Sequence, residues 1–259
     1  MTRQVLALEA RLRQCRNVRT IGVRPNFTDY SAEEVRMIRC ADKIYYPTSF
    51  YADLFDAMGK PTFPSYHTYK CVQDKIKQSA LFQLTGLPHP RTRVFYGRRQ
   101  QLKIKRLFAY PFIAKEPRGS AMGRGVYLIE NNVDLDAYTH DRHVCYIQQY
   151  LPIDRDIRVV VIGGRVAHAY WRIAGDGEFR TNVARGGRIC LDPVPDDAIS
   201  LALQAAKTCG WDDVGLDICC FDGDYTILEA NMKYGREGFR AAGIDYYAMM
   251  ERMIDEGYI

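Results

Sequence analysis

The chain has 259 residues, 47% of them hydrophobic, and carries 36 Lys or Arg against 31 Asp or Glu, for a net charge of +5. This length suffices for one large or two to three small domains, and the composition is that of a globular protein. No apolar stretch approaches the length of a membrane span, and the eight cysteines show no CxxC or Cys/His metal spacing. We therefore expect reduced thiols, a cytoplasmic location and no membrane association.

The first third of the chain alternates short helix and strand patterns. The N-terminal segment MTRQVLALEARLRQCR mixes apolar residues with Glu9 and several Arg, which predicts an amphipathic helix rather than a signal peptide. Ser31 and Glu34 form a capping box at the start of a helix, and Gly59 closes another helix. Strands are expected at 18–23 and 43–47, and helices at 31–41 and 49–59.

The rest of the chain is richer in strand patterns, which turn residues separate. Gly163-Gly164 and Asp222-Gly223-Asp224 each predict the turn of a β-hairpin. Helices are expected at 69–84, 196–210 and 245–255, and strands at 91–96, 110–117, 123–129, 145–151 and in two hairpins at 156–174 and 215–231.

The second hairpin carries the most informative residues of the chain. Asp217 and Glu229 each lie six residues from Gly223, so a three-residue loop would place them opposite one another. Glu229 and Asn231 share a strand face because side chains alternate along a strand. Two carboxylates and an amide oxygen are hard ligands that suit Mg²⁺. A solvated hairpin with ordinary surface acids is the alternative interpretation at this point.

Lys115 ends an apolar strand and precedes a loop that contains Gly119, Gly123 and Gly125. A lysine there can meet phosphate as a point charge, and glycines let backbone N–H groups approach phosphate oxygens. Because the lysine precedes the loop, the order differs from that of P-loop nucleotidases and of protein kinases. Taken alone, the same residues also fit a surface lysine before a hairpin turn.

Polar residues recur at spacing two on predicted strands, which puts each pair on one face. The pairs are Asp156 with Arg158, Tyr170 with Arg172, and Arg180 with Asn182. A sheet face with Arg158, Arg172 and Arg180 would form an anion site, since buried arginines need a partner. Cross-strand salt bridges, for example between Asp156 and a neighbouring arginine, are the alternative.

Between Lys75 and Lys115 the chain has ten Lys or Arg and no Asp or Glu. The dense part, called the basic stretch below, consists of Arg91, Arg93, Arg98, Arg99, Lys103, Lys105 and Arg106. It could face an acidic peptide, nucleotide phosphates or nucleic acid, or be a solvated basic helix and loop. No nucleic-acid-binding motif accompanies it, so nucleic acid is not an expected partner.

The order of these motifs resembles that of the ATP-grasp superfamily, and within it the RimK-like amino-acid ligases. The resemblance covers residues 65–259 and is carried by PFIAKEPRGSAMGRGV, YIQQYLPIDRDIRVVVIGGRV, GEFRTNVARGG, GLDI and LEANMKYGREGF. It implies an α/β (α+β) protein with two α+β subdomains that grip ATP, behind a short αβ N-terminal domain. The implied boundaries are 1–65 for the N-terminal domain, 66–148 for the small or lid subdomain, and 149–259 for the subdomain with the magnesium site.

The resemblance also implies a role for each motif residue. Contacts to ATP would come from Lys75 and Lys115 at the phosphates, Gly119 and Ser120 in a lid, Gln149, Tyr150 and Leu151 around adenine, Asp156 at the ribose, and Arg180 and Asn182 by the triphosphate. Two Mg²⁺ ions, with Mn²⁺ as an alternative, would be held by Asp217, Glu229 and Asn231. The catalytic cations would be Arg158, Arg172 and Arg180. Arg158 and Arg172, together with Arg185, would bind the acceptor carboxylate or its acyl-phosphate.

The implied activity is ATP-dependent ligation of a carboxylate to an amine through an acyl-phosphate, with an amino acid or peptide as substrate. A small-molecule kinase and a non-catalytic ATP-binding module are the alternatives. Three features depart from the family pattern: only about 65 residues precede the core, Trp171 and Ile173 flank Arg172, and MKYGREGF replaces a Ser-Pro-Gly turn. An acidic peptide could dock on the basic stretch, and a homo-oligomer is compatible with the sequence.

Overall fold

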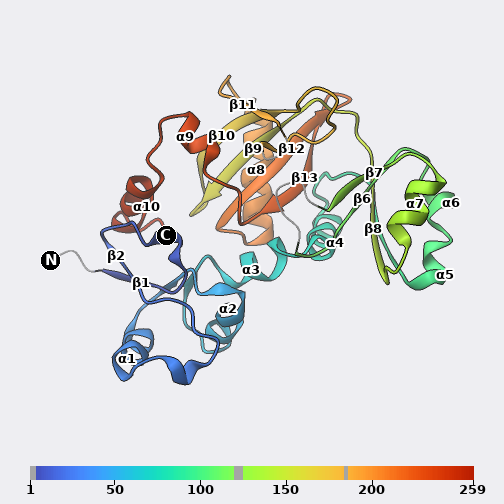
Figure 1. Ribbon diagram of the computed structural model, residues 1–259. Coiled ribbons are helices and arrows are strands. Elements are labelled where there is room, and N and C mark those ends of the chain that lie inside the picture. The colour runs from blue at the N-terminus through green and yellow to red at the C-terminus, as the bar shows by residue number, and fades with distance from the viewer. Residues whose placement is uncertain (1–3, 120–124, 184–185) are drawn as a thin grey trace.

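The computed structural model describes residues 4–119, 125–183 and 186–259 of the chain. Three sheets form three lobes arranged in an arch, with the N-terminal lobe and the lobe of β6 (Phe112–Lys115), β7 (Val126–Ile129) and β8 (Val144–Gln149) at its two ends (Figure 1). A five-stranded sheet forms the centre. In the described residues, no helix combines the length and apolar character needed to cross a membrane.

The N-terminal lobe is built on a parallel sheet in the order β2-β1-β3-β4. The strands are β1 (Val5–Ala7), β2 (Val18–Thr20), β3 (Ile44–Tyr45) and β4 (Thr62–Phe63). The helices are α1 (Ala32–Cys40) and α2 (Thr48–Ala57), with 3-10 turns at Ala10–Leu12 and Phe27–Asp29. The predicted capping box is confirmed, because the Ser31 hydroxyl accepts from the Glu34 N–H and the Glu34 carboxylate from the Ser31 N–H.

The predicted N-terminal amphipathic helix is wrong. Residues 5–7 form β1, which pairs with β2 on one side and with β3 on the other. Leu6, Ala7 and Leu8 are all buried, at 5%, 0% and 0% exposure. An interior strand of a parallel sheet is apolar on both faces, so its sequence lacks the alternation that would separate it from a helix.

The single helix expected at 69–84 is in fact two helices, α3 (Tyr66–Val72) and α4 (Lys75–Thr85). Asp74 interrupts them, since its carboxylate accepts hydrogen bonds from the N–H groups of Ile76 and Lys77 and so begins α4 as its N-cap. The side chain of Arg118 donates to the other carboxylate oxygen of Asp74 at 2.8 Å. This cap places Lys75 at the first position of α4.

The second sheet is antiparallel, in the order β5-β8-β6-β7. Its strands are β5 (Thr92–Tyr96), β6 (Phe112–Lys115), β7 (Val126–Ile129) and β8 (Val144–Gln149), as the sequence predicts within a few residues. Short helices α5 (Gly97–Gln101) and α6 (Ile104–Leu107), with α7 (Asn132–Thr139), cover it (Figure 1). Its separate core includes Phe95, Ile104, Phe112 and Ile147, all fully buried.

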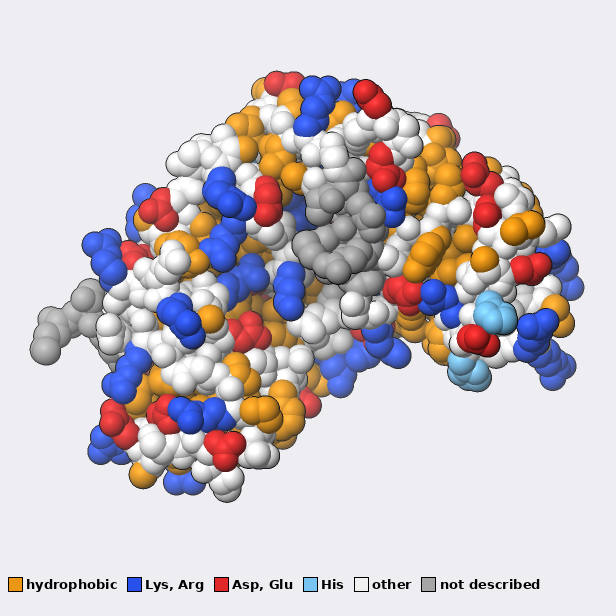
Figure 2. Space-filling view, viewed as in Figure 1, with side chains coloured by type: hydrophobic (Ala, Val, Ile, Leu, Met, Phe, Trp, Pro, Cys, Tyr) orange, Lys and Arg blue, Asp and Glu red, His pale blue; other side chains and the backbone are white. Residues whose placement is uncertain are grey.

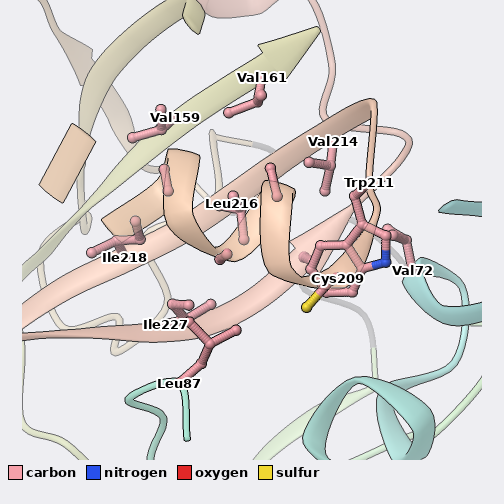
Figure 3. Close-up of a cluster of buried hydrophobic side chains, with 14 of the residues drawn as sticks. Val72, Leu87, Val159, Val161, Cys209, Trp211, Val214, Leu216, Ile218 and Ile227 are labelled. Atoms are coloured by element: carbon pink, nitrogen blue, oxygen red, sulfur yellow. The ribbon is translucent and has the colours of Figure 1, made fainter. Parts of the chain in front are cut away.

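The central sheet runs β11-β10-β9-β12-β13 and is antiparallel throughout. Its strands are β9 (Arg155–Ile162), β10 (Arg165–Ile173), β11 (Arg188–Cys190), β12 (Asp213–Phe221) and β13 (Asp224–Asn231). Helix α8 (Asp196–Cys209) packs on one face of it, where Figure 3 shows Val159, Val161 and Leu216 of the sheet beside Trp211 and Cys209. The other face is free of α8 and carries the polar residues of the site.

In the β12–β13 hairpin the predicted pairing is present, but the turn differs from the one expected. A two-residue turn, Asp222-Gly223 with φ of 52° and 89°, replaces the expected three-residue loop. The register then shifts by one residue beyond Ile218, a β-bulge in β13. The bulge restores the predicted alignment, and Asp217 lies opposite Glu229.

The C-terminal segment packs back on the N-terminal lobe. Helices α9 (Glu237–Ala241) and α10 (Tyr246–Asp255) follow β13, and Met250 and Met253 of α10 share a core with Leu12 and Tyr45. The Tyr45 hydroxyl donates to the Ile259 carbonyl at 2.8 Å. The three-domain division at 1–65, 66–148 and 149–259 stays a prediction.

Candidate functional site

A cavity of about 610 Å³ is lined by residues of both antiparallel sheets. Thirteen of the fifteen predicted site residues line it: Lys75, Lys115, Gln149, Tyr150, Leu151, Asp156, Arg158, Arg172, Arg180, Asn182, Asp217, Glu229 and Asn231. Gly119, in the loop after β6, is exposed with a φ of 71° and is not among the lining residues. Ser120 and Arg185 lie outside the described residues. The fold thus gathers residues that are up to 156 positions apart in the chain.

The sheet face below the cavity is built from five polar side chains on three adjacent strands. Arg158 of β9 lies in register with Asp217 of β12 and with Tyr170 of β10, and Asp156 lies in register with Arg172. Gly215 permits this packing, because a Cβ there would lie 2.4 Å from the Cβ of Tyr234 and 3.1 Å from the Cδ of Arg158. The spacing-two prediction for these two strands is therefore confirmed.

Asp217 is only 6% exposed, and both of its carboxylate oxygens are engaged. Arg158 donates to Oδ1 from Nε and to Oδ2 from Nη2, the latter at 3.1 Å. Arg172 Nη2 lies 3.0 Å from Oδ2, and the Asn231 amide donates to the same oxygen at 3.3 Å. Burial raises the pKa of Asp217, but the charges of Arg158 and Arg172 outweigh burial and hold the pKa below its ordinary value.

Arg172 also forms a bidentate pair with Asp156, from Nε to Oδ1 at 2.7 Å and from Nη2 to Oδ2 at 2.5 Å. The Thr181 hydroxyl donates to Asp156 Oδ2 at 2.6 Å. The cross-strand salt bridges that the sequence left as an alternative are thus present. Arg158 and Arg172 balance buried carboxylates, so an incoming anion would have to share their donors.

Two lysines approach the hairpin from the opposite side. Lys75, at the start of α4, places its Nζ 3.0 Å from Glu229 Oε1. Lys115, at the end of β6, is 7% exposed. Burial lowers the pKa of Lys115 below its ordinary value. The positive charge of Lys75 lowers this pKa further, whereas the negative charge of Glu229 raises it without cancelling the effect of burial. Two ammonium groups near one carboxylate form a site that attracts further negative charge.

The end of β8 and the start of its connection to β9, Gln149-Tyr150-Leu151, pass beside the cavity. Leu151 is buried, Tyr150 is half-buried and Gln149 is exposed. Apolar residues complete the lining: Ile113, Val126, Ile153, Phe179, Val183 and Leu228. The cavity therefore joins an apolar part to a charged part, which is the pattern of small-molecule sites in general.

Arg180 and Asn182 line the cavity from a loop, and the prediction that they lie on a strand is wrong. β11 pairs with residues Trp171–Ile173 of β10, and in the described part of the chain residues 180–182 do not pair with any strand. Arg180 is held by Glu178 instead, at 2.9 Å from Nε and 2.7 Å from Nη2.

Several lining residues were not predicted from the sequence: Arg11, Lys233, Tyr234, Gly235, Arg236 and Glu237. Residues 233–237 follow Asn231 within six positions, so their closeness in the chain to the β12–β13 hairpin could have indicated them. Arg11 had no such signal, because it lies in the N-terminal segment, far in the chain from the other lining residues. Only the packing of the N-terminal lobe against α10 brings it to the cavity.

The lining of the cavity is strongly basic. Eight of its described residues are Lys or Arg and four are Asp or Glu, so the lining carries a net charge of +4. Figure 2 shows Lys and Arg side chains gathered over the middle of one face, between the N-terminal lobe and the central part. A polyanion fits this balance better than a neutral ligand.

Asp217, Glu229 and Asn231 provide the donor types that Mg²⁺ prefers, two carboxylates and an amide oxygen on one hairpin face. In the described residues, no group of three or more His, Cys, Asp or Glu is placed to hold a metal, so a site here depends on the amide and on ligand oxygens as well. A carboxylate has about four lone-pair sites. A cation on Asp217 would therefore require one of the four donor contacts of this carboxylate to open. With that condition, the donor set fits Mg²⁺.

Comparisons with known proteins identify the family of this chain. The family model described as RimK-like ATP-grasp domain matches residues 72–254. A protein of Parasynechococcus marenigrum named "Probable alpha-L-glutamate ligase" is 31% identical over 210 residues, which is 78% of this chain but 45% of that protein. The chain thus spans less than half of the length of this relative.

Two solved structures show the same fold. A RimK domain ATP-grasp protein from Sphaerobacter thermophilus superposes with a TM-score of 0.70 at 18% identity, covering 97% of this chain and 99% of that one. The ATP-grasp ligase PsnB, complexed with minimal precursor, Mg and ADP, gives a TM-score of 0.72 at 18% identity, covering 100% and 99%. The family match over most of the chain and the shared fold lead to one conclusion: this chain belongs to the RimK-like ATP-grasp family and has the ATP-grasp fold.

Proposed function

We propose that the protein is an ATP-dependent carboxylate–amine ligase. The observation that supports this most is one cavity of about 610 Å³ that combines an apolar part, a lining charge of +4 and two carboxylates facing each other on a hairpin. ATP with a carboxylate substrate supplies an apolar base and several negative charges, which match that lining. Membership of the RimK-like ATP-grasp family supports the same activity.

The proposed roles follow the position of each side chain around the cavity. Adenine would lie beside residues 149–151, with the ribose near Asp156. The phosphates would contact Lys75, Lys115 and Arg180, and Asn182 would lie beside them. The segment that contains Gly119 and Ser120 would act as a lid. Arg158 and Arg172, which already bind carboxylates within the protein, would share their donors with the substrate carboxylate.

The reaction has two steps. A carboxylate oxygen attacks the γ-phosphorus of ATP, the bond from that phosphorus to the bridging oxygen breaks, and ADP leaves. An amine nitrogen then attacks the acyl carbon, the bond from that carbon to the phosphate oxygen breaks, and the amine loses a proton. Arginine donors would stabilise the charge on the phosphoryl and acyl oxygens in both steps. No side-chain nucleophile is needed.

Asp217, Glu229 and Asn231 would hold the magnesium, as two Mg²⁺ ions or with Mn²⁺ in their place. A divalent cation bound there supplies charge neutralisation of the phosphates. Lys75 contributes to the same region by keeping Glu229 in position through its 3.0 Å contact.

The activity can be tested with purified protein, ATP, Mg²⁺ and pools of amino acids and short peptides. Release of ADP and phosphate that depends on a carboxylate and an amine, with a new amide detected by mass spectrometry, is the expected result. A stable phosphorylated product without an amide would instead identify a kinase. ATP binding without turnover for every pool would favour a non-catalytic module and contradict the proposal.

An amino acid or a peptide is the substrate class that the relatives suggest. Besides the glutamate ligase, a mouse protein named "N-acetylaspartylglutamate synthase A" is 32% identical over 175 residues, 64% of this chain and 46% of that protein. Both names describe joining amino-acid units. We therefore propose an amino acid or peptide for this chain as well.

The basic stretch is proposed as a docking surface for an acidic peptide. All seven of its cations are exposed, and they lie on β5, α5 and α6 and around them, outside the cavity lining. Exposed charges of one sign attract an oppositely charged chain at low ionic strength. Binding of fluorescent poly-glutamate that weakens with added salt is expected, and replacing Arg98, Arg99, Lys103 and Arg106 by Gln should abolish it. No binding at low salt would end this proposal.

Other predictions about the whole protein remain open. All eight cysteines are free, which agrees with the reduced thiols expected from the sequence. The cytoplasmic location, a homo-oligomeric state and the three-domain division stay predictions that fractionation, light scattering and limited proteolysis can check.

A further inference from the structure

We infer that Gln78 is a positioning residue for the divalent-cation site: its side-chain amide holds the backbone between Glu229 and Asn231 and so fixes how these two side chains meet a metal ion. This rests on the proposed function, which places the metal at Glu229 and Asn231. Gln78 is 3% exposed and is not among the residues that line the large cavity. It therefore acts on the site only through the residues that it holds.

The amide of Gln78 makes three hydrogen bonds, all with backbone groups. Its Nε2 donates to the Ala230 carbonyl at 2.8 Å and to the Val72 carbonyl at 2.6 Å. Its Oε1 accepts from the Ala230 N–H at 2.9 Å. Both protons of the NH₂ group are used, and the opposite orientation of the amide would lose all three bonds. Gln78 thus binds Ala230 as a neighbouring strand would, through one donor and one acceptor.

Ala230 lies between the two proposed metal ligands on β13. A peptide group is planar, so a contact to the Ala230 N–H holds the peptide plane that begins at the Cα of Glu229. A contact to the Ala230 carbonyl holds the plane that ends at the Cα of Asn231. The Ala230 side chain is itself buried in the core, at 1% exposure. One amide therefore orients the backbone next to both ligands.

The β-bulge makes this part of β13 depend on an outside contact. Leu228 is the extra residue of the bulge and directly precedes Glu229, so the pairing with β12 is irregular there. β13 is also an edge strand of the central sheet. On its outer side, the Pro88 carbonyl accepts from the Ile227 N–H at 2.9 Å before the bulge, and Gln78 binds the strand after it.

The same amide joins the hairpin to the start of α4. Gln78 follows Lys75 by three positions, so both side chains lie on one face of the helix. This face meets β13 at the edge of the central sheet (Figure 1). Lys75 Nζ lies 3.0 Å from Glu229 Oε1. Gln78 therefore holds the β13 backbone against α4, while Lys75 contacts the end of the Glu229 side chain.

A role in stability alone is the alternative, because the N–H and carbonyl of a buried strand edge need partners in any case. Gln101 offers a matched comparison in the lobe of β5–β8. Its Nε2 donates to the Arg142 carbonyl at 2.6 Å, and it lies outside the lining of the large cavity. Loss of either amide should destabilise the fold, but only loss of Gln78 should affect the metal site.

The experiment measures Mn²⁺ binding in the presence of ADP by electron paramagnetic resonance, which needs no turnover. Gln78→Met removes the three hydrogen bonds without a change in charge. It should weaken Mn²⁺ binding by roughly tenfold or more. The melting temperature should fall by a few degrees, because the Ala230 backbone loses its partner. The affinity for ADP without metal should change by less than about twofold, since Lys115 and Arg180 remain in place.

In the ligase assay, Gln78→Met should raise the Mg²⁺ concentration that gives half of the maximal rate. The kcat at saturating Mg²⁺ should stay within about threefold of the wild type. Gln101→Met should lower the melting temperature and keep the wild-type Mn²⁺ affinity. An unchanged Mn²⁺ affinity in Gln78→Met would overturn the positioning role. An equal loss of metal-free ADP affinity would do the same, because it would indicate a general loosening of the cleft.

Gln78→Asn is the second variant, since it keeps a donor and an acceptor on a side chain shorter by one methylene. It should fold and bind Mn²⁺ with an affinity between those of the wild type and Gln78→Met. If neither variant folds, Gln78 serves the fold alone and the positioning role is rejected.

Failure of the proposed function gives a different pattern. A wild type that binds Mn²⁺ and ADP but forms no amide would reject the ligase, while weaker Mn²⁺ binding in Gln78→Met would still support the positioning role. Amide formation together with equal Mn²⁺ affinities would keep the ligase and reject the role of Gln78. No Mn²⁺ binding by the wild type would reject the metal site and this role together.

Discussion

Two carboxylates that lie opposite each other on one hairpin differ in their surroundings. Asp217 is buried and accepts from Arg158, Arg172 and Asn231, whereas the Glu229 side chain is 20% exposed and pairs with Lys75. The sequence treats them as equivalent ligands at equal distance from Gly223. The structure shows that Asp217 also has a structural role, since it balances two buried guanidinium groups.

This difference predicts different effects of two isosteric substitutions. Glu229→Gln should reduce turnover on the order of 100-fold or more while the melting temperature stays close to that of the wild type. Asp217→Asn should lose turnover and also destabilise the fold by on the order of 3 kcal/mol, because it leaves buried arginines without their counter-charge. ADP release and urea denaturation measure the two effects. Wild-type rates in Glu229→Gln would contradict the metal-site assignment.

Substitution of Lys115 should affect ATP binding without lowering the stability of the fold. Lys115→Met removes a buried ammonium whose pKa burial already lowers, so the fold should be as stable as the wild type or more stable. Loss of a phosphate partner should weaken ATP binding by roughly tenfold or more. Isothermal titration with ATP and thermal unfolding test this. Lys103→Met, on the exposed surface of the same lobe and outside the cavity lining, is the control. Unchanged ATP affinity in Lys115→Met would exclude Lys115 from the site.

At the scale of elements, the start of α4 couples a helix cap to the site. Asp74 caps the helix and anchors Arg118 at the other side of the loop, and Lys75 is the next residue. The backbone N–H of Lys75 donates to the Pro117 carbonyl at 3.1 Å. Both proposed phosphate-binding segments, the start of α4 and the residues after β6, therefore depend on Asp74.

Two caps of the same kind make a matched test of this coupling. Asp74→Ala and Asn131→Ala each remove an N-cap, of α4 and of α7, and each should cost about 1 kcal/mol of stability. Only Asp74→Ala should also weaken ATP binding, since α7 lies outside the cavity lining. Urea denaturation and ATP titration provide the two measurements. Equal ATP affinities in both variants would show that the cap of α4 does not position Lys75.

At the scale of the whole molecule, the two ends of the chain share a core. Leu12 and Tyr45 of the N-terminal lobe, Val160 of the central sheet and Met250 of α10 belong to one buried cluster. The lobe of β5–β8 has its own core, with Phe95 and Ile147. The N-terminal lobe is therefore tied to the central sheet more closely than its position at the start of the chain suggests.

Met250→Ala tests this arrangement. Met250 is completely buried, with 0% of its surface exposed to solvent. The substitution should therefore lower the free energy of unfolding by about 2–5 kcal/mol. Hydrogen exchange should show the loss of protection in β1 and in α10 together, while the strands β5–β8 keep theirs. Loss of protection confined to α10 would mean that the N-terminal lobe is stable by itself.

The sequence by itself determined the local features of this protein. Capping residues, turn residues and alternation located α1, α8, α10 and both hairpins, because these signals act between residues close in the chain. Motif order gave thirteen residues that line one cavity, although the role of each stays a proposal. Only the tertiary structure decided the rest. Residues 5–7 form a strand, since burial on both faces overrides helical propensity. Carboxylates on neighbouring strands neutralise Arg158 and Arg172. The tertiary structure also brought Arg11 to the cavity through packing between segments more than 200 residues apart, which no local pattern encodes.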